Sequence, residues 1–292
     1  ITGGALDAAA STLGVSTSIT LSSGSLDCGS GSVSTVTLSI SGTGALTTDT
    51  GGLSTRDLTV TGGSIATGNV AAAITITGAA ASTVSVSGTP SITTNASGAT
   101  NFDFVFANGN DTSLNSNTAL GRTRYTAGTT TLGAAFTTQA ANLDGGSLSL
   151  GTLGTLIVGE LSMGNAGSTL TTRNVGAAIT LNGTGASSLA LTAGTLVANA
   201  AAGNFDFDFT DTDGATIQGG ITNLGRVRVS AGCAVTQQAA DTTLVELEVN
   251  GAGAVFNGSG NTLVVTTTVD IDTGGAILHA PLSALMTALL VS

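Results

Sequence analysis

Two groups of oxygen-bearing side chains are the clearest candidates for chemistry in this sequence. They are Asp206, Asp208, Asp211 and Asp213 in one group, and Asn108, Asn110 and Asp111 in an earlier one. Ca²⁺ takes six to eight oxygen ligands, so carboxylates and amides at this density are suited to hold it. Solvated turns and ion pairs use the same residue types. Calcium is therefore one interpretation of these seven residues, and a purely structural role is the other.

Enzymes that cleave polysaccharides typically use a pair of carboxylates, or Ca²⁺ with a basic residue. The chain contains no Asp-Asp pair and no lysine, and its only histidine, His279, has no evident nucleophile or acid partner. Four of the six arginines lie in two Arg-X-Arg pairs within alternating segments. We therefore expect no enzymatic activity and assign no catalytic residue.

The acidic residues Asp206 and Asp208 open a series of three segments that alternate apolar and charged residues, which is typical of β-strands. Each segment begins twenty residues after the previous one. A constant step of this length predicts a parallel β-solenoid, in which every side chain stacks on its counterpart. The apolar ladder expected inside is Phe205, Phe207, Phe209, Val227, Val229, Leu247 and Val249. The charged ladder expected outside is Asp206, Arg226, Glu246, Asp208, Arg228 and Glu248.

The two ladders are expected to contribute unequally to stability. Exposed ion pairs contribute about 0 to 1 kcal/mol each, whereas each buried apolar side chain contributes about 1.5 to 3 kcal/mol. The apolar ladder is therefore expected to hold the coils together, and the charged ladder to fix their register.

Composition supports a narrow solenoid. The 292 residues include 43 glycines, eight phenylalanines, one tyrosine and no tryptophan, which is too little side-chain volume for a wide globular core. The sequence therefore predicts an all-β fold, a single parallel β-solenoid (β-helix) of about 20 residues per coil over residues 1–280.

A longer repeat of about 104 residues lies on top of the coil step. The segments Asn69–Ile76, Asn101–Phe104 and Leu120–Arg124 recur as Asn174–Leu181, Asn204–Phe207 and Leu224–Arg228. This offset is about five coils, so a block of several coils has been duplicated.

The pattern changes in residues 281–292. Leu282, Leu285, Met286, Leu289 and Leu290 follow at helical spacing after Pro281, which predicts a short C-terminal helix. Such a segment either caps the open end of the solenoid or docks on the next subunit.

Charge and cysteine content restrict the partners. The net charge is −11 and no basic stripe is present, which disfavours binding to nucleic acid or to an anionic membrane surface. No apolar run is long enough to span a bilayer. Cys28 and Cys233 are some ten coils apart, too far to pair within one straight rod. They are either buried thiols or form a bond between molecules.

Short segments such as Ile74–Gly78, Val84–Gly88 and Ile179–Gly183 resemble the repetitive regions of secreted bacterial β-helix proteins. These proteins include haemagglutinin-like adhesins, autotransporter passengers and some surface-layer proteins. The resemblance implies an extracellular or cell-surface location and a structural or adhesive role, with no catalytic residue carried over. The chain begins at Ile1 and not at Met, so we interpret it as a mature or excised segment.

Three functions fit these observations. The leading expectation is a structural protein that self-assembles into an extracellular fibre or surface layer, without a cofactor unless calcium binds. The alternative is a monomeric, rod-like adhesin that binds glycan. A minor alternative is an ice-binding protein, because threonines in Thr-X-Thr pairs such as Thr59/Thr61 can form flat outward arrays, although β-propensity alone also favours them.

Overall fold

The computed structural model describes residues 1–220, 223–238, 241–278 and 288–291. The described residues form β-strands, turns and loops, and none of them lies in a helix. Within these residues there is consequently no helix of the length and apolar character needed to span a membrane. The chain divides into two compact units, and each is described by itself. Unit 1 comprises Ile1–Gln139 and Gly145–Leu148, and unit 2 comprises Ala140–Asp144 and Ser149–Ser292.

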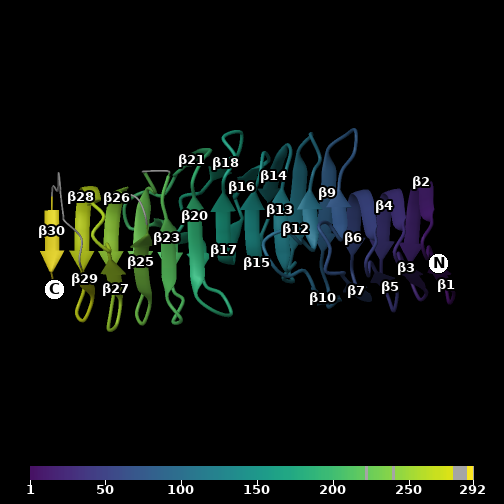
Figure 1. The fold of residues 1–292 in the computed structure, drawn as a ribbon, viewed down its shortest axis with the longest axis horizontal. Coiled ribbons are helices and arrows are strands. Elements are labelled where there is room, and N and C mark those ends of the chain that lie inside the picture. The colour runs from purple at the N-terminus through teal and green to yellow at the C-terminus, as the bar shows by residue number, and fades with distance from the viewer. Residues whose placement is uncertain (221–222, 239–240, 279–287, 292) are drawn as a thin grey trace. The chain divides into compact units, whose positions relative to one another are not determined.

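Each unit is a stack of short strands (Figure 1). The strands of unit 1 are β1 (Ala5–Asp7), β2 (Thr12–Leu21), β3 (Ser25–Asp27), β4 (Ser32–Ile40), β5 (Ala45–Thr47), β6 (Gly52–Val60), β7 (Ser64–Ala66), β8 (Ile74–Ile76), β9 (Ser82–Val86), β10 (Ser91–Thr93), β11 (Phe104–Phe106), β12 (Thr112–Ser116), β13 (Arg122–Tyr125) and β14 (Thr129–Leu132). The residues of β15 (Ala135–Leu143) and β16 (Ser147–Ser149) are divided between the units.

The strands of unit 2 are β17 (Thr155–Met163), β18 (Thr169–Thr171), β19 (Ala177–Leu181), β20 (Ser187–Leu191), β21 (Thr195–Val197), β22 (Phe205–Phe209), β23 (Ala215–Gln218), β24 (Arg226–Val229), β25 (Ala234–Gln238), β26 (Thr242–Val249), β27 (Val255–Asn257), β28 (Leu263–Ile271), β29 (Ala276–Leu278) and β30 (Ala288–Val291).

The first coils of unit 1 each combine one long strand with one three-residue strand. The long strands β2, β4 and β6 pair in parallel, and Thr12 lies beside Ser32, which lies beside Gly52. The three-residue strands β1, β3, β5 and β7 pair in parallel in the same way. Their central residues Leu26, Leu46 and Ile65 are at most 1 % exposed, so the alternating sequence places one apolar row inside the coil.

Corners recur at the same place in successive coils. Ala9, Gly29 and Asp49 have φ angles of 50°, 55° and 42°. This left-handed conformation turns the chain sharply and normally favours glycine, asparagine or aspartate. Two of the three corner residues are of these types.

Unit 2 contains the three alternating segments from which the solenoid was predicted. Val227 of β24 lies beside Phe207 of β22 on one side and Leu247 of β26 on the other, and all three are fully buried. The register therefore follows the predicted twenty-residue step. In the part of the chain that the structure describes, about 14 turns follow one another roughly 20 residues apart. The predicted parallel β-solenoid is confirmed; the single domain over residues 1–280 stays a prediction.

One coil in each unit is longer than the others. In unit 1, Ile74 of β8 lies beside Phe104 of β11, about thirty residues later, and in unit 2 Ile179 of β19 lies beside Phe207. Each long coil contains three short strands, β8, β9 and β10 or β19, β20 and β21, followed by a loop. The 104-residue repeat therefore places one long coil in each unit.

The expected C-terminal helix falls mostly on residues 279–287, which lie outside the described residues. Residues Ala288–Val291 are described and form strand β30. This strand pairs in parallel with β28, with Ala288 beside Thr268. The predicted helix is therefore wrong for Leu289 and Leu290. The twenty-residue register of the solenoid extends to these residues, and strand pairing with β28 overrides their helical spacing in the sequence.

Candidate functional site

The most elaborate polar site in unit 2 surrounds Asp206, which is 1 % exposed. Its Oδ1 accepts hydrogen bonds from Thr172 Oγ1 and from the backbone N–H groups of Asn199 (3.0 Å) and Ala200 (3.1 Å). Its Oδ2 accepts a hydrogen bond from the backbone N–H of Arg226 (2.9 Å). The buried carboxylate thus receives four donors, three of them from main chain, which compensates for its removal from water.

Unit 1 contains the same site around Asp103, which is fully buried. Its Oδ1 accepts hydrogen bonds from Thr67 Oγ1 and from the backbone N–H groups of Asn95 and Ala96 (both 3.1 Å). Its Oδ2 accepts the backbone N–H of Arg122 at 2.8 Å. Neither Asp103 nor Thr67 was predicted from the sequence as a site residue. The repeated Asn-Phe-Asp-Phe motif was the signal that could have found Asp103.

Each carboxylate fastens the loop that ends the long coil, and we call residues 94–101 and 198–204 the anchored loops. In unit 2, Asn199 Nδ2 donates to the carbonyl of Thr172 (2.8 Å). Asn174 Oδ1 accepts hydrogen bonds from the N–H of Ala201 (2.8 Å) and from Asn204 Nδ2 (2.7 Å). The anchored loop is thereby tied at both ends.

The anchored loop of unit 1 has the matching contacts. Asn95 Nδ2 donates to the carbonyl of Thr67 (2.6 Å). Asn69 Oδ1 accepts hydrogen bonds from the N–H of Ser97 (2.9 Å) and from Asn101 Nδ2 (2.8 Å). The asparagines of the 104-residue repeat therefore recur because they hold equivalent loops.

The glycine of the repeated Leu-Gly-Arg motif belongs to the same site. Gly225 has a φ of 72°, and a Cβ built on it would overlap Asp206 Oδ2. Gly121 has a φ of 71°, and its Cβ would overlap Asp103 Oδ2 in the same way. Glycine is required at both positions because the backbone turns there and passes directly against the carboxylate.

The expectation that both acids of β22 face solvent is wrong. Asp206 is 1 % and Asp208 is 4 % exposed, and all five residues of β22 are buried. The anchored loop covers Asp206, since the loop's own N–H groups bond to the carboxylate. The guanidinium of Arg228 lies 4.8 Å from the centre of the Phe205 ring, a cation–π contact. The alternation of apolar and charged residues in the sequence did not indicate that other groups cover the outer side of β22.

The charged ladder exists, but its two rows differ. In the first row the side chain of Arg226 forms an ion pair with Glu246. The contact between Arg226 and Asp206 is instead a hydrogen bond from the backbone N–H of Arg226 to the carboxylate. In the second row Arg228 forms an ion pair with Asp208. The hydrogen bond from Arg228 to Asp208 raises the pKa of the guanidinium; burial lowers it by less, and the charges of Asp208 and Glu248 add smaller increases.

Reversing the charge in Arg226→Glu is expected to lower the free energy of unfolding by about 2 kcal/mol. The paired side chains of Arg226 and Glu246 are only 16 % and 15 % exposed, so the new carboxylate would face a like charge with little solvent screening. Urea unfolding measures the change. The double variant with Glu246→Arg restores an opposite pair and should recover at least half of the loss. Equal stability of Arg226→Glu and the unaltered protein would contradict a stabilising role for this row.

The calcium interpretation of the acidic groups is not supported by their geometry. Asp211 accepts hydrogen bonds from Ser187 Oγ and from the N–H groups of Gly183 (3.1 Å) and Asp213 (2.9 Å). Burial raises the pKa of Asp211, but these hydrogen bonds outweigh it and leave the pKa below its ordinary value. The carboxylate is thus held by N–H and O–H donors, which a cation would have to displace.

In the second group, the side chain of Asn108 is also hydrogen-bonded to nearby residues. Asn108 Nδ2 donates to the carbonyl of Ala80 (2.7 Å) and to Ser82 Oγ, and its Oδ1 accepts the N–H of Asn110 (3.0 Å). Asn110 and Asp111 are exposed turn residues. Across the described ranges, no three His, Cys, Asp or Glu side chains gather in a group that could hold a metal ion.

The two cysteines are fully buried free thiols, one in each unit. Burial raises the pKa of Cys28 to about 11 and that of Cys233 to about 12, with the nearby carboxylates Asp27 and Asp211 adding to it. Both are therefore protonated and shielded in the folded chain. His279 lies outside the described residues.

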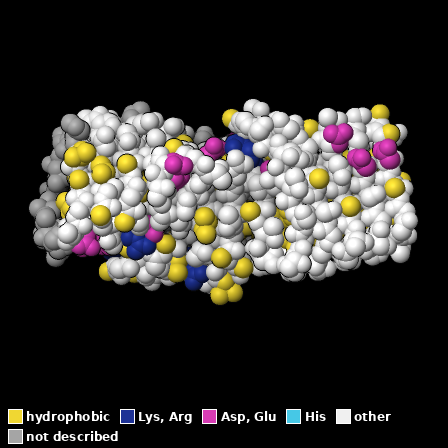
Figure 2. Space-filling view, turned by 90° about the horizontal axis from the view of Figure 1, so that it is seen from below, with side chains coloured by type: hydrophobic (Ala, Val, Ile, Leu, Met, Phe, Trp, Pro, Cys, Tyr) yellow, Lys and Arg dark blue, Asp and Glu magenta, His cyan; other side chains and the backbone are white. Residues whose placement is uncertain are grey.

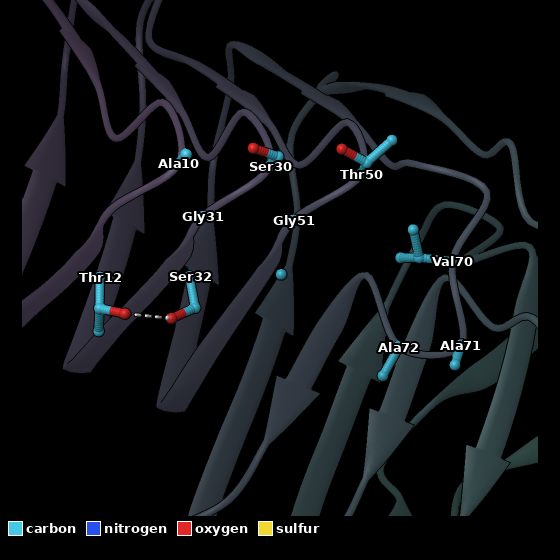
Figure 3. A pocket seen from close by; sticks show the side chains of 11 residues that line it. Ala10, Thr12, Ser30, Gly31, Ser32, Thr50, Gly51, Val70, Ala71 and Ala72 are labelled. Carbon is cyan, nitrogen blue, oxygen red and sulfur yellow. Dashed lines mark hydrogen bonds between the residues drawn. The ribbon is translucent and has the colours of Figure 1, made fainter.

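A shallow groove of about 450 Å³ lies over the corners of unit 1 (Figure 3). Small side chains such as Ala10, Ser30 and Thr50 line it in successive coils, and none of its lining residues is charged. A Cβ on Gly31 or Gly51 would overlap a carbonyl of the preceding coil. Close stacking of the coils thus explains the small residues without a ligand.

The Thr-X-Thr pairs do not stack into a continuous threonine array. Thr59 lies beside Ser39 and Ser85 in its register row. Thr35 is 8 % exposed, and its hydroxyl donates to the carbonyl of Thr37 at 3.2 Å. The row Thr20, Ser39, Thr59 and Ser85 is thus a mixed row of serine and threonine.

Comparison of the chain with protein-family models, with curated proteins and with solved structures finds no match in any of the three.

Proposed function

We propose that this chain is a structural protein of the cell exterior whose copies assemble into a fibre or surface layer. The observation that carries the proposal is the distribution of charge. The chain has a net charge of −11, yet residues 58–102 and 174–205 contain no charged side chain at all. Copies of the same acidic protein repel one another, so such long uncharged segments leave surface on which two copies can meet.

The outward rows of unit 1 fit this role. Thr20, Ser39, Thr59 and Ser85 lie side by side on β2, β4, β6 and β9. On the face in Figure 2, most of the visible surface is neither hydrophobic nor charged. Small uncharged side chains on a sheet allow close approach of a neighbour without desolvating ions.

The buried polar groups of the two Asp sites also favour a structural role. The oxygens of Asp103 and Asp206 are occupied by donors from their own unit. Such networks fix loops and coils in one arrangement, which a scaffold requires. The extracellular location is supported by the resemblance to secreted β-helix proteins.

Electron microscopy and light scattering across a range of protein and salt concentrations test the proposal. We expect fibres or sheets with a regular repeat, and more assembly at about 0.5 M than at about 0.02 M salt, because salt screens the repulsion between acidic copies. Monodisperse particles of one chain under all conditions would overturn the proposal. Specific retention of such particles on a glycan array would then favour the monomeric adhesin.

A further inference from the structure

The row of three-residue strands stops inside each unit, at β10 and at β21. In unit 1 the strand order is β1-β3-β5-β7-β10, so β10 pairs with β7 and lies at the edge of its sheet. In unit 2, β21 pairs with β18 and, among the described strands, with no other. These are equivalent strands of the 104-residue repeat. Both edges are internal to the chain and do not depend on where it begins or ends.

Burial agrees with an edge position for β10 and β21 among the described strands. The interior three-residue strands β3, β5, β7 and β18 have a buried central residue between two half-buried ones. In β10 and β21 the central residue is half-buried and both flanking residues are exposed. Ile92 and Leu196 thus end apolar rows in which Ile65 and Leu170 are at most 1 % exposed.

In each edge strand, the central residue points its backbone N–H and C=O away from the neighbouring strand. Ser91 N–H donates to the carbonyl of Gly63 (2.9 Å), and the carbonyl of Thr93 accepts the N–H of Thr67 (3.0 Å). Since successive residues of a parallel strand point to opposite sides, the N–H and C=O of Ile92 point away from β7. These groups are positioned to hydrogen-bond to an incoming strand.

The edge in unit 2 has the same arrangement. Thr195 N–H donates to the carbonyl of Ser168 (2.9 Å), and the carbonyl of Val197 accepts the N–H of Thr172 (3.0 Å). The N–H and C=O of Leu196 therefore point away from β18. Val197 is 39 % exposed.

The charge distribution indicates what fits these edges. Both strands lie within the uncharged segments 58–102 and 174–205 of a chain whose net charge is −11. Another copy of the chain can therefore approach here without bringing like charges together. The second copy also supplies a matching strand, in which a central Ile or Leu lies between small or β-branched residues.

We propose that β10 and β21 are assembly edges, each pairing with the same edge of a second copy; this inference rests on the proposed self-assembly. An antiparallel pair centred on Leu196 lets that residue and its counterpart in the second copy exchange two N–H···O bonds. The two half-exposed leucines then cover each other. With two such edges per chain, one at β10 and one at β21, pairing propagates from copy to copy into a filament or layer.

Like-charge substitutions test the pairing. In the antiparallel arrangement Thr195 lies opposite Val197 of the second copy, so the variant Thr195→Glu/Val197→Glu places carboxylates face to face across the edge. Ser91→Glu/Thr93→Glu does the same at β10. We expect each variant to weaken the association measured by sedimentation velocity at least tenfold, and the four-residue variant to sediment as a single chain.

Matched controls place the same charges on the neighbouring interior strands, as Thr169→Glu/Thr171→Glu in β18 and Ser64→Glu/Ala66→Glu in β7. These control positions are half-buried, whereas the edge positions are exposed, and their strands are not edges. Circular dichroism verifies that every variant folds. Controls that assemble like the unaltered protein, while edge variants do not, support the inference; equal assembly of edge variants and controls overturns it and leaves the proposed function intact.

A disulfide provides a positive test. The variant Thr195→Cys/Val197→Cys places thiols opposite each other in the proposed pair, and mild oxidation should link two copies. The natural cysteines are buried with raised pKa values and should not compete. Absence of linked dimers in assembled material contradicts the antiparallel pair. An unaltered protein that never associates overturns the proposed function and this inference together.

Discussion

Asp206→Ala is expected to lower the free energy of unfolding by about 3 to 5 kcal/mol. The carboxylate is 1 % exposed and accepts three backbone N–H groups and one hydroxyl. Its removal leaves several donors without an acceptor, at about 1 to 3 kcal/mol for each one that stays buried. The anchored loop of residues 198–204 should detach first, because two of those donors belong to it. Urea unfolding and amide hydrogen exchange at Asn199 and Ala200 measure both effects.

Asp213→Ala is the matched control. Asp213 lies seven residues away on an exposed turn of the same unit, and its truncation should change stability by no more than about 0.5 kcal/mol. The unit 1 variant Asp103→Ala should repeat the effect of Asp206→Ala, since the four donors are equivalent. A loss below about 1 kcal/mol at both buried positions would show that the carboxylates do not hold the loops.

Gly225→Ala is expected to lower the free energy of unfolding by about 4 kcal/mol, although it adds only one methyl group. The residue has a φ of 72°, which costs a non-glycine residue about 1 to 2 kcal/mol. The new Cβ would also overlap Asp206 Oδ2 and lie 2.7 Å from Ala198 Cβ, so the buried carboxylate has to move away from its donors. Thermal and urea unfolding of the variant measure the loss.

Gly203→Ala separates the two causes. Gly203 has a φ of 78°, but a Cβ there meets no atom within 4 Å. It should therefore show the conformational cost alone, about 1 to 2 kcal/mol. Similar losses for Gly225→Ala and Gly203→Ala would mean that contact with Asp206 contributes nothing. A clearly larger loss at Gly225 identifies the carboxylate as the reason for the repeated Leu-Gly-Arg motif.

The first of these predictions concerns a residue that the sequence presented in a different role. Asp206 alternates with phenylalanines, and period-two alternation in a solenoid normally means one inward and one outward row. The outward side of β22 is nevertheless covered, because the long coil returns a loop over it and that loop's N–H groups bond to the carboxylate. Alternation reports the local strand geometry, and it cannot report what a loop from another coil brings against the second face.

The sequence by itself determined the coil. The twenty-residue step from Phe207 to Val227 and Leu247 is a chemical periodicity, and similar side chains one step apart can only meet if strands stack in parallel. The 104-residue repeat was also visible without coordinates. These features are legible because stacking repeats the same environment at a constant interval, so the same residue types return.

Only the tertiary structure decided how the repeat is used. It showed that Asp206 and the repeated asparagines fasten a loop, that β30 continues the register where a helix was expected, and that among the described strands the row of three-residue strands ends at β10 and β21. Each of these depends on contacts between residues of different coils. These contacts depend on the points at which loops leave the solenoid and return over it. Local residue patterns do not specify those points.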